Sequence, residues 1–233
     1  MGIGVLLAAI ALALGDPATQ PAKERVLLGH STGGRPIAAV RVGDLTSERQ
    51  ALVIGCIHGD ECAGIAVTRR LARMRVDGVD LWIVHDLNPD GRALGVRQNG
   101  RGVDLNRNFA SEWVPLGRRW DPQYSGPRPF SEPEARIARR LIRRLRPDVT
   151  VWYHQPQALV RAWGPSVAAA RRYARLARVP YRSIRWPNGT APNWQNHTFP
   201  GAASFVVELA AGPLAPEAAA RHARAALRLA RRP

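Results

Sequence analysis

The sequence is poor in cysteine, in lysine and in long apolar runs. Cys56 and Cys62 are its only cysteines among 233 residues, so a bond between these two and a pair of buried free thiols are the alternatives. The longest apolar run, Ile3 to Leu14, is too short to span a bilayer. Neither His-Glu-x-x-His nor His-x-x-Glu-His occurs, which excludes the two helical zinc motifs.

The apolar run near the N-terminus predicts export. It consists of small and aliphatic residues, with Ala-x-Ala-like cleavage options near Ala11 and Ala13, and a polar stretch follows it. No Lys or Arg precedes the run, which departs from the positively charged start of a secretory signal. An uncleaved N-terminal anchor or a disordered tail is the alternative. We predict that residues 1–22 lie outside the fold and that the protein is extracytoplasmic, periplasmic or associated with the cell wall.

The chain is strongly basic, and the charge is almost wholly arginine. The formal net charge is +16, and Lys23 is the only lysine. The arginines cluster over 136–146, 161–178 and 221–232, where they alternate with Ala, Leu and Ile at helical spacing. Much of the charge is therefore expected on solvated helix faces. A field of this sign attracts polyanions such as anionic cell-wall polymer or anionic lipid; no recognition motif accompanies it, so no specific nucleic-acid partner is predicted.

Residues 23–233 are predicted to form one α/β domain. Short apolar runs alternate with amphipathic stretches, which is typical of a mixed, mainly parallel sheet flanked by helices. The predicted strands are 25–29, 36–42, 51–58, 81–85, 149–153 and 204–207, and the predicted helices are 63–74, 131–146, 166–177 and 216–231.

Two local features stand out between the predicted elements. Ser131 and Glu134 have the spacing of a capping box, which predicts that each side chain satisfies backbone amides at the helix start. The polar loop 88–131 is too long to be a mere connection in so small a domain. We expect the substrate to bind there.

A His and a Glu three residues apart follow the apolar run 51–56. His58 and Glu61 can both turn onto one cation, and hydrolytic zinc sites often combine two His and one carboxylate with an open position for water. Four-residue matches also arise by chance, and a His at a strand end is more often hydrogen-bonded than ligating. Because Cys62 stands where a second His would follow, the third ligand must come from far away in sequence.

His154 is the best candidate for the third ligand. It ends the predicted strand 149–153, at the kind of sheet edge where the sites of open α/β proteins lie. His85 is also near a strand end, but its strand is expected to continue past it. The remaining histidines lie in a polar loop, a Pro/Asn-rich stretch and an Arg-rich helix: His30, His197 and His222.

A hydrolase of this kind also needs a general base and a way to hold its substrate. Glu208 follows the strand 204–207 and is a candidate base, although a lone Glu there would more often be a salt-bridged edge residue. The loop 88–131 adds cations and amides suited to holding a peptide's terminal carboxylate. These are Arg97, Asn99, Arg101, Asp104, Asn106 and Arg107.

Two longer strings make the pattern specific. Asn88-Pro89-Asp90-Gly91 and Gly102-Val103-Asp104-Leu105-Asn106-Arg107-Asn108-Phe109, together with the candidates above in this order, resemble the zinc metallocarboxypeptidase family of carboxypeptidase A. The resemblance spans roughly residues 25–212 and implies an α/β fold that holds one Zn²⁺. It further implies His58, Glu61 and His154 as zinc ligands.

The same resemblance implies roles for the other side chains. Glu208 would be the general base and proton shuttle, and Arg97 would polarise the scissile carbonyl and stabilise the oxyanion. Asn106 and Arg107 would bind the terminal carboxylate, and Asp104 would orient His58.

The sequence departs from the family's larger members in one region. Those members place a mobile Tyr shortly before the catalytic Glu. This chain has tryptophans in that region, and Tyr181 lies further back. The sequence therefore does not support a role for a tyrosine in closing on the substrate. We expect the stretch 180–201 to line the specificity pocket with Trp186, Asn193, Trp194, Asn196 and His197.

The compact length is similar to the bacterial branch of the family that includes murein peptide amidases. These cleave the γ-D-glutamyl–diaminopimelate bond of cell-wall peptides, so the resemblance implies a peptide substrate with a free C-terminal carboxylate. A general carboxypeptidase, a zinc deacylase of N-acyl amino acids and a non-catalytic wall-binding module are the alternatives.

Overall fold

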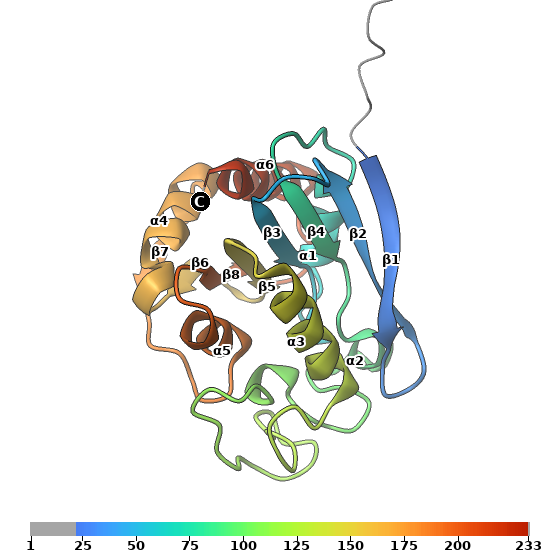
Figure 1. Cartoon of the computed structure of the whole chain (residues 1–233). Coiled ribbons are helices and arrows are strands. Elements are labelled where there is room, and N and C mark those ends of the chain that lie inside the picture. The colour runs from blue at the N-terminus through green and yellow to red at the C-terminus, as the bar shows by residue number, and fades with distance from the viewer. Residues whose placement is uncertain (1–21, 233) are drawn as a thin grey trace, which may run out of the picture.

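An eight-stranded sheet runs through the middle of the molecule and is covered by helices on both faces (Figure 1). The structure is a computed structural model that describes residues 22–232. The predicted export segment therefore falls almost wholly outside the described residues, and only Ala22 of it belongs to the sheet. Within the described part, none of the helices combines the length and the apolar character needed to cross a membrane.

The order of the strands is β1-β2-β4-β3-β5-β8-β6-β7. The four central strands, β4, β3, β5 and β8, are parallel to one another. Antiparallel pairs join β1 to β2, β2 to β4 and β6 to β8, while β6 and β7 are parallel. The strands span Ala22–His30 (β1), Pro36–Gly43 (β2), Gln50–Ile54 (β3), Asp80–Val84 (β4), Val149–His154 (β5), Gln157–Ala162 (β6), Tyr181–Ser183 (β7) and Ala203–Ala210 (β8).

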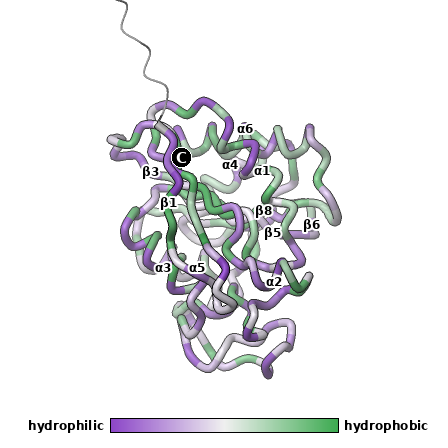
Figure 2. The backbone as a smooth tube through the Cα atoms, turned by 90° about the vertical axis from the view of Figure 1, so that its right-hand side faces the viewer, coloured by the Kyte–Doolittle hydropathy of each residue, from purple (hydrophilic) through white to green (hydrophobic). Residues whose placement is uncertain are grey.

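Burial explains why the central strands read as continuous apolar runs. Every residue of β4 and β5 is buried, because helices cover both faces of a parallel sheet. Figure 2 shows the hydrophobic, green stretches gathered along the central strands. The mixed, mainly parallel sheet predicted from the sequence is confirmed.

The helices divide between the two faces. Helices α1, α4 and α6 pack against one another on one face, and α3 and α5 lie on the other (Figure 1). Their bounds are Gly64–Leu71 (α1), Pro89–Leu94 (α2), Pro133–Leu145 (α3), Val167–Ala177 (α4), Ala191–Thr198 (α5) and Pro216–Arg231 (α6). The four helices predicted from the Ala- and Arg-rich segments are all present, with ends that shift by up to three residues.

Neighbouring residues of β5 show how the two faces are filled. Trp152 points to the α5 side, where its ring lies 6.2 Å from that of Phe109. Tyr153 points to the opposite side, where its hydroxyl bonds that of Tyr173 at 2.8 Å, and Tyr173 in turn bonds Nδ1 of His222 at 2.8 Å. The alternation of a strand thus places aromatic rings in both layers of the core.

The predicted capping box is wrong. Helix α3 has Glu132 as its N-cap residue and no side-chain cap. Ser131 instead accepts a hydrogen bond from Asn108 and donates one to Glu132, at 2.9 and 2.8 Å. Glu134 turns to the β1–β2 loop and accepts from the amide of Thr32 at 2.8 Å. Tertiary partners have replaced the local ones that the spacing suggested.

Candidate active site

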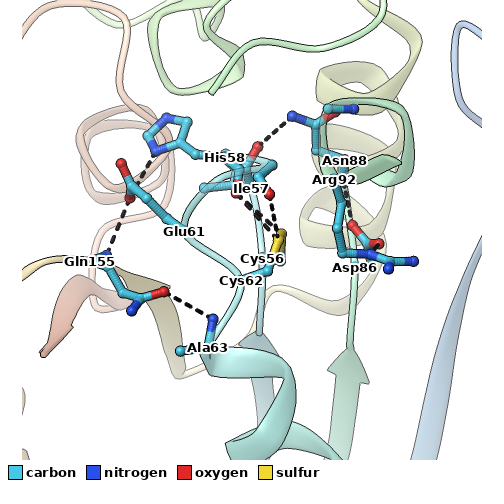
Figure 3. The surroundings of a disulfide bond; sticks show 12 residues. Cys56, Ile57, His58, Glu61, Cys62, Ala63, Asp86, Asn88, Arg92 and Gln155 are labelled. Atoms are coloured by element: carbon cyan, nitrogen blue, oxygen red, sulfur yellow. Dashed lines mark hydrogen bonds and ion pairs between the residues drawn. A yellow bond between two sulfur atoms is a disulfide. The ribbon is translucent and has the colours of Figure 1, made fainter. Parts of the chain in front are cut away.

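The loop between β3 and α1 carries two of the predicted ligands, His58 and Glu61. A disulfide between Cys56 and Cys62 closes this loop, with the two Cα atoms 4.8 Å apart (Figure 3). The amide of Glu61 donates to the carbonyl of His58 at 3.1 Å, which folds the loop into a tight turn. Gly59 has to be glycine, because a Cβ there would overlap the backbone of Gly91 and Arg92 in helix α2.

The Asn-Pro-Asp-Gly motif holds this loop from outside. Asn88 is fully buried, and its Nδ2 donates to the carbonyls of Ile57 and Gln98 at 3.0 and 3.1 Å (Figure 3). Asp90 points away and accepts from the amide of Gly33 at 2.7 Å and from Nη1 of Arg35 at 2.6 Å. The motif is therefore a frame for the ligand loop and the β1–β2 turn.

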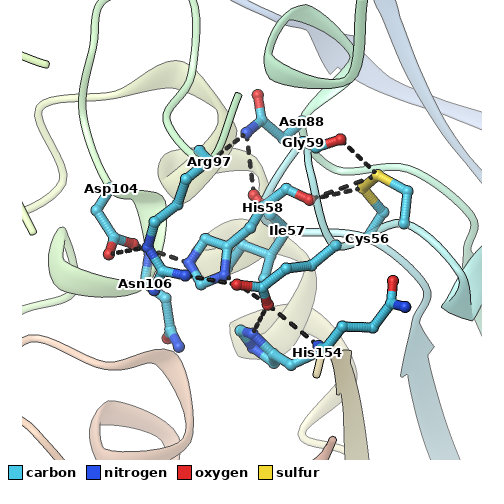
Figure 4. Close-up of polar contacts among 12 residues, drawn as sticks. Cys56, Ile57, His58, Gly59, Asn88, Arg97, Asp104, Asn106 and His154 are labelled. Carbon is cyan, nitrogen blue, oxygen red and sulfur yellow. Dashed lines mark hydrogen bonds and ion pairs between the residues drawn. A yellow bond between two sulfur atoms is a disulfide. The ribbon is translucent and has the colours of Figure 1, made fainter. Parts of the chain in front are cut away.

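The three predicted metal ligands converge on one point. Nδ1 of His58 and Nδ1 of His154 lie 3.1 and 3.0 Å from Oε2 of Glu61 (Figure 4). One ligand atom from each residue lies within 4.8 Å of the other two. Strand β5 ends at His154, as predicted, whereas His85 bonds Thr68 at 2.9 Å and takes no part in the cluster.

The donor set fits zinc. Two imidazoles and one carboxylate are the ligands that catalytic zinc often takes. Nδ1 of His58 and Nε2 of His154 are buried without a hydrogen-bond partner in residues 22–232. Burial lowers the pKa of His154 to about 4. Despite burial, the hydrogen bond from His154 and the proximity of His58 hold the pKa of Glu61 well below its usual range. At neutral pH the site therefore presents a neutral imidazole and a carboxylate, the forms that bind a cation.

Asp104 ties the ligands to the neighbouring loop. Its side chain is fully buried, and Oδ1 accepts from Nε2 of His58 at 2.9 Å and from the amide of Asn106 at 2.8 Å. Oδ2 accepts from Nε of Arg97 at 3.0 Å (Figure 4). The proton that Asp104 draws to Nε2 leaves the Nδ1 lone pair of His58 free for a metal.

Arg97 reaches the ligand cluster from the same loop. Besides its bond to Asp104, its Nη1 donates to Oε1 of Glu61 at 2.5 Å. The guanidinium is largely buried and stays cationic, since its two carboxylate neighbours outweigh the effect of burial and raise its pKa. It therefore sits within reach of a group bound at the metal position.

Glu208 lies beside His154 on the next strand. The two residues are paired in the register of β5 and β8. Glu208 is 7% exposed, and its Oε2 has no hydrogen-bond partner in the described part of the chain. Burial, followed by the charge of Glu61, raises the pKa of Glu208 to about 7. A carboxyl with this pKa can both accept and return a proton near neutral pH.

These side chains surround a cavity of ≈ 250 Å³. Arg107 forms part of its wall, and Nε of Arg107 is buried without a partner among the described residues. Asn106 is held by the amide of Ala191, which donates to its Oδ1 at 2.9 Å. The cavity is lined by His58, Glu61, Arg97, Asn106, Arg107, His154, Gln155, Pro156, Gln157, Arg161, Trp186, Pro187, Thr190, Val206 and Glu208.

A family model described as zinc carboxypeptidase matches residues 21–185, most of the chain. The chain belongs to the zinc carboxypeptidase family. The three predicted ligands fall within the matched residues, together with Arg97, Asp104, Asn106 and Arg107. Glu208 lies beyond them, and its place beside the ligands comes from the structure.

Curated relatives include both amidases and carboxypeptidases. The chain is 35% identical to murein peptide amidase A of Escherichia coli K12 over 133 residues, which are 49% of this chain and 52% of that protein. It is 26% identical to metallocarboxypeptidase A of Trichophyton tonsurans over 209 residues, 72% of this chain and 50% of that protein. The matches thus span about half the length of these relatives.

Solved structures support the same fold. The murein-tripeptide amidase of Escherichia coli O157 aligns with a TM-score of 0.71 and 26% identity over 93% of this chain and 96% of its own. The carboxypeptidase A of Helicoverpa armigera aligns with a TM-score of 0.76 over 90% of this chain and 68% of its own, at 18% identity. At that identity the second likeness concerns the fold alone.

Several residues predicted to contribute to the site lie elsewhere in the structure. Asn99 is buried against Glu132 and Glu134, at 2.9 and 3.0 Å, and Arg101 is exposed, so neither lines the cavity. Of the stretch 180–201, only Trp186, Pro187 and Thr190 reach it. The prediction is wrong for the residues of α5 that it named, which pack into the core or bond neighbouring loops: Asn193, Trp194, Asn196 and His197.

Sequence reasoning missed Arg161 and Gln155 as cavity residues. Arg161 lies on β6, a strand absent from the predicted set because it is short and follows His154 almost directly. Leu159, Val160 and Ala162 are all apolar, so no alternation marks this strand and the sequence offers no signal that places Arg161. Gln155 donates to the carbonyls of Ala210 and Gly212 at 2.7 and 2.8 Å and closes one rim.

Proposed function

We propose that this chain is a zinc-dependent carboxypeptidase that hydrolyses the C-terminal amide bond of cell-wall peptides, at the γ-D-glutamyl–diaminopimelate bond. The observation that carries the proposal is the convergence of His58, Glu61 and His154 beside the unpartnered carboxyl of Glu208. A binding module would require neither a buried base nor a three-ligand metal site. Relatives named murein peptide amidase support the choice of substrate.

The chemistry follows from the residues around the cavity. When bound, Zn²⁺ supplies a Lewis acid that makes water nucleophilic near neutral pH. Glu208 removes the proton from the attacking water and returns it to the leaving amine, which its pKa of about 7 permits. Arg97 donates to the developing oxyanion, at a position set by its bond to Asp104.

The substrate's free carboxylate is assigned to Arg107 and Asn106 in the wall of the cavity. Arg107 offers a buried Nε without a partner, and Asn106 lies beside it with its Oδ1 fixed by a backbone amide. Binding a carboxylate there would satisfy Arg107 by charge-assisted hydrogen bonds. Cleavage is then confined to the last residue of a peptide, because only that residue carries the group that Arg107 and Asn106 bind.

Location and wall contact are part of the proposal. The apolar run Ile3 to Leu14 supports export, and the net charge of +16 supports attraction to anionic wall polymer. We propose neither a specific nucleic-acid partner nor a defined oligomer.

Product analysis tests the function. Purified, zinc-loaded protein is incubated with L-Ala-γ-D-Glu-diaminopimelate and with a library of ordinary peptides, each with and without chelator, and the products are identified by mass spectrometry. We expect chelator-sensitive release of diaminopimelate alone. Release of ordinary C-terminal residues would indicate a general carboxypeptidase instead. Cleavage of N-acyl amino acids alone would indicate a deacylase.

A further inference from the structure

Arg161 is the cavity arginine to which the proposed reaction gives no role. Three arginines line the cavity, and the oxyanion and the terminal carboxylate account for Arg97 and Arg107. Arg161 comes from β6, a different segment from the loop that carries the other two. A third cation in a small cavity calls for a ligand with a further negative charge.

The sheet register fixes where Arg161 lies. Strand β6 is antiparallel to β8, with Arg161 opposite Val206 and Leu159 opposite Glu208. Opposite residues of an antiparallel pair point to the same face, so Arg161, Val206 and Glu208 share one face of the sheet. Arg161 is two residues further from the catalytic edge than Glu208, which is about 7 Å along a strand. It therefore marks the wall of the cavity beyond the proposed base.

The guanidinium of Arg161 is held in place but is not neutralised. Its Nε is buried without a hydrogen-bond partner, and no carboxylate lies within ion-pair distance of it in the described structure. Its central carbon lies 5.6 Å from the ring centroid of Trp186, which orients the group by a cation–π contact. Burial lowers the pKa of Arg161, opposed by the charge of Glu208. Arg161 is half-buried, and a buried N–H without a partner is ordinarily satisfied, so this guanidinium is suited to an anion from outside.

We propose that Arg161 binds a second carboxylate, carried by the side chain of the substrate's C-terminal residue, and so selects C-terminal residues with an acidic group at the end of the side chain. The inference rests on the proposed function and sharpens it. Arg107 binds the backbone carboxylate, and Arg161 binds the one at the far end of the side chain. Diaminopimelate carries both, and lysine is the same residue without the far carboxylate.

That difference supplies a matched pair of substrates. The kcat and KM are measured for L-Ala-γ-D-Glu-diaminopimelate and for the same peptide ending in L-lysine, with the wild type, Arg161→Gln and Arg161→Lys. We expect the wild type to favour the diaminopimelate peptide in kcat/KM. Arg161→Gln should lower kcat/KM for that peptide about 10- to 100-fold, mainly through KM, because a charge-assisted bond is lost. Its effect on the lysine peptide should be small, and Arg161→Lys should keep part of the preference.

Arg182→Gln is the matched control. Arg182 is paired with Arg161 in the register of β7 and β6, is exposed and does not line the cavity. It removes the same charge from the neighbouring strand, so we expect it to leave the preference for diaminopimelate unchanged. Equal zinc content and equal far-UV circular dichroism for all variants establish that each is folded.

Two outcomes would overturn the proposal. A wild type that cleaves both peptides equally well has no side-chain carboxylate site. A fall on both peptides in Arg161→Gln, with a shifted pH profile of kcat, would mean that Arg161 acts through Glu208.

A binding measurement keeps the inference separate from the proposed function. Free diaminopimelate and free lysine are titrated into zinc-loaded protein by calorimetry, which requires no turnover. Tighter binding of diaminopimelate that disappears in Arg161→Gln would support the site even if neither peptide is cleaved. In that case the proposed reaction fails and the anion site stands. Equal affinity of the two amino acids for the wild type would overturn the site whether or not the peptides are cleaved.

Discussion

His154 and Glu208 occupy paired positions on adjacent parallel strands, so a metal ligand and the proposed base leave the sheet at the same level. Residues paired in this way point to the same face. His154 ends β5, whereas β8 continues past Glu208 to Ala210. The strand pairing thus fixes the base relative to a ligand by backbone hydrogen bonds, with no flexible loop between them.

Replacement of Glu208 by Gln should abolish turnover without loss of zinc. The amide cannot take a proton from water, and we expect kcat to fall about 10²- to 10⁴-fold, the range for a lost general base. Steady-state kinetics and atomic absorption measure the two quantities. Glu48→Gln, at an exposed site, is the control. Near-normal activity with one zinc per chain would show that Glu208 is not the base.

Replacement of Asp104 by Asn should weaken zinc binding. The amide can no longer draw the proton of His58 to Nε2 as a carboxylate does, and Arg97 loses its buried partner. We expect a 10- to 100-fold loss of affinity, as for other groups that orient metal-bound His. Competition with a chromophoric chelator measures it, with the exposed Asp77→Asn as the control. An unchanged affinity would leave Asp104 without the orienting role.

Replacement of Asn88 by Ala should separate stability from metal binding. It leaves the carbonyls of Ile57 and Gln98 without their side-chain donor in the frame of the ligand loop. Asn196→Ala is a matched control, since that buried amide bonds both backbone groups of Ser204 at 2.9 and 2.8 Å, away from the ligands.

Both variants should lose about 1–3 kcal/mol of unfolding free energy. Only Asn88→Ala should also bind zinc more weakly. Urea unfolding of metal-free protein and chelator competition give the two values. Equal zinc affinity in the two variants would contradict the framing role of the motif.

Replacement of Asp90 by Asn should make the free energy of unfolding depend less on pH in the acidic range. Burial opposes ionisation, but hydrogen bonds from Gly33 and Arg35 hold the pKa of Asp90 below its usual value of 3.8. The unfolded chain therefore takes up the proton first, and this contribution to stability is present above pH 3.8 and is lost as the pH falls through the lower, folded-state pKa. Near pH 7, the metal-free wild type should have a higher free energy of unfolding than metal-free Asp90→Asn. The difference between the two free energies should become smaller below pH 4. A gap that widens in acid would contradict this.

The sequence was most informative where function constrains a side chain at a strand end. His58, Glu61, His154 and Glu208 could be proposed because each follows an apolar run, and parallel strands bring their carboxyl ends to one edge. The long string around Asp104 contains Arg107, and the family resemblance that the string carries implied the role of Arg97. These residues meet in the structure as predicted from that pattern.

The failures have a common physical cause. Ser131 and Glu134 had the right spacing for a local cap, but Asn108 and Thr32 offered buried partners that spacing cannot reveal. Strand β6 is short, and its pairing with β8 rather than its own pattern makes it a strand. Arg161 was missed because nothing in the sequence tells a buried arginine from the many solvated ones.

The separation of the proposed zinc ligands along the chain determines when the site can form during folding. His58 and Glu61 share one turn, but His154 lies 93 residues from Glu61, at the end of the neighbouring parallel strand β5. Contacts of such long range form late, after the central sheet has assembled. We therefore expect that zinc does not direct the early steps of folding and that it binds tightly only to the folded chain. Zinc uptake should therefore report the late folding step in which β3 and β5 pair and bring the three side chains together.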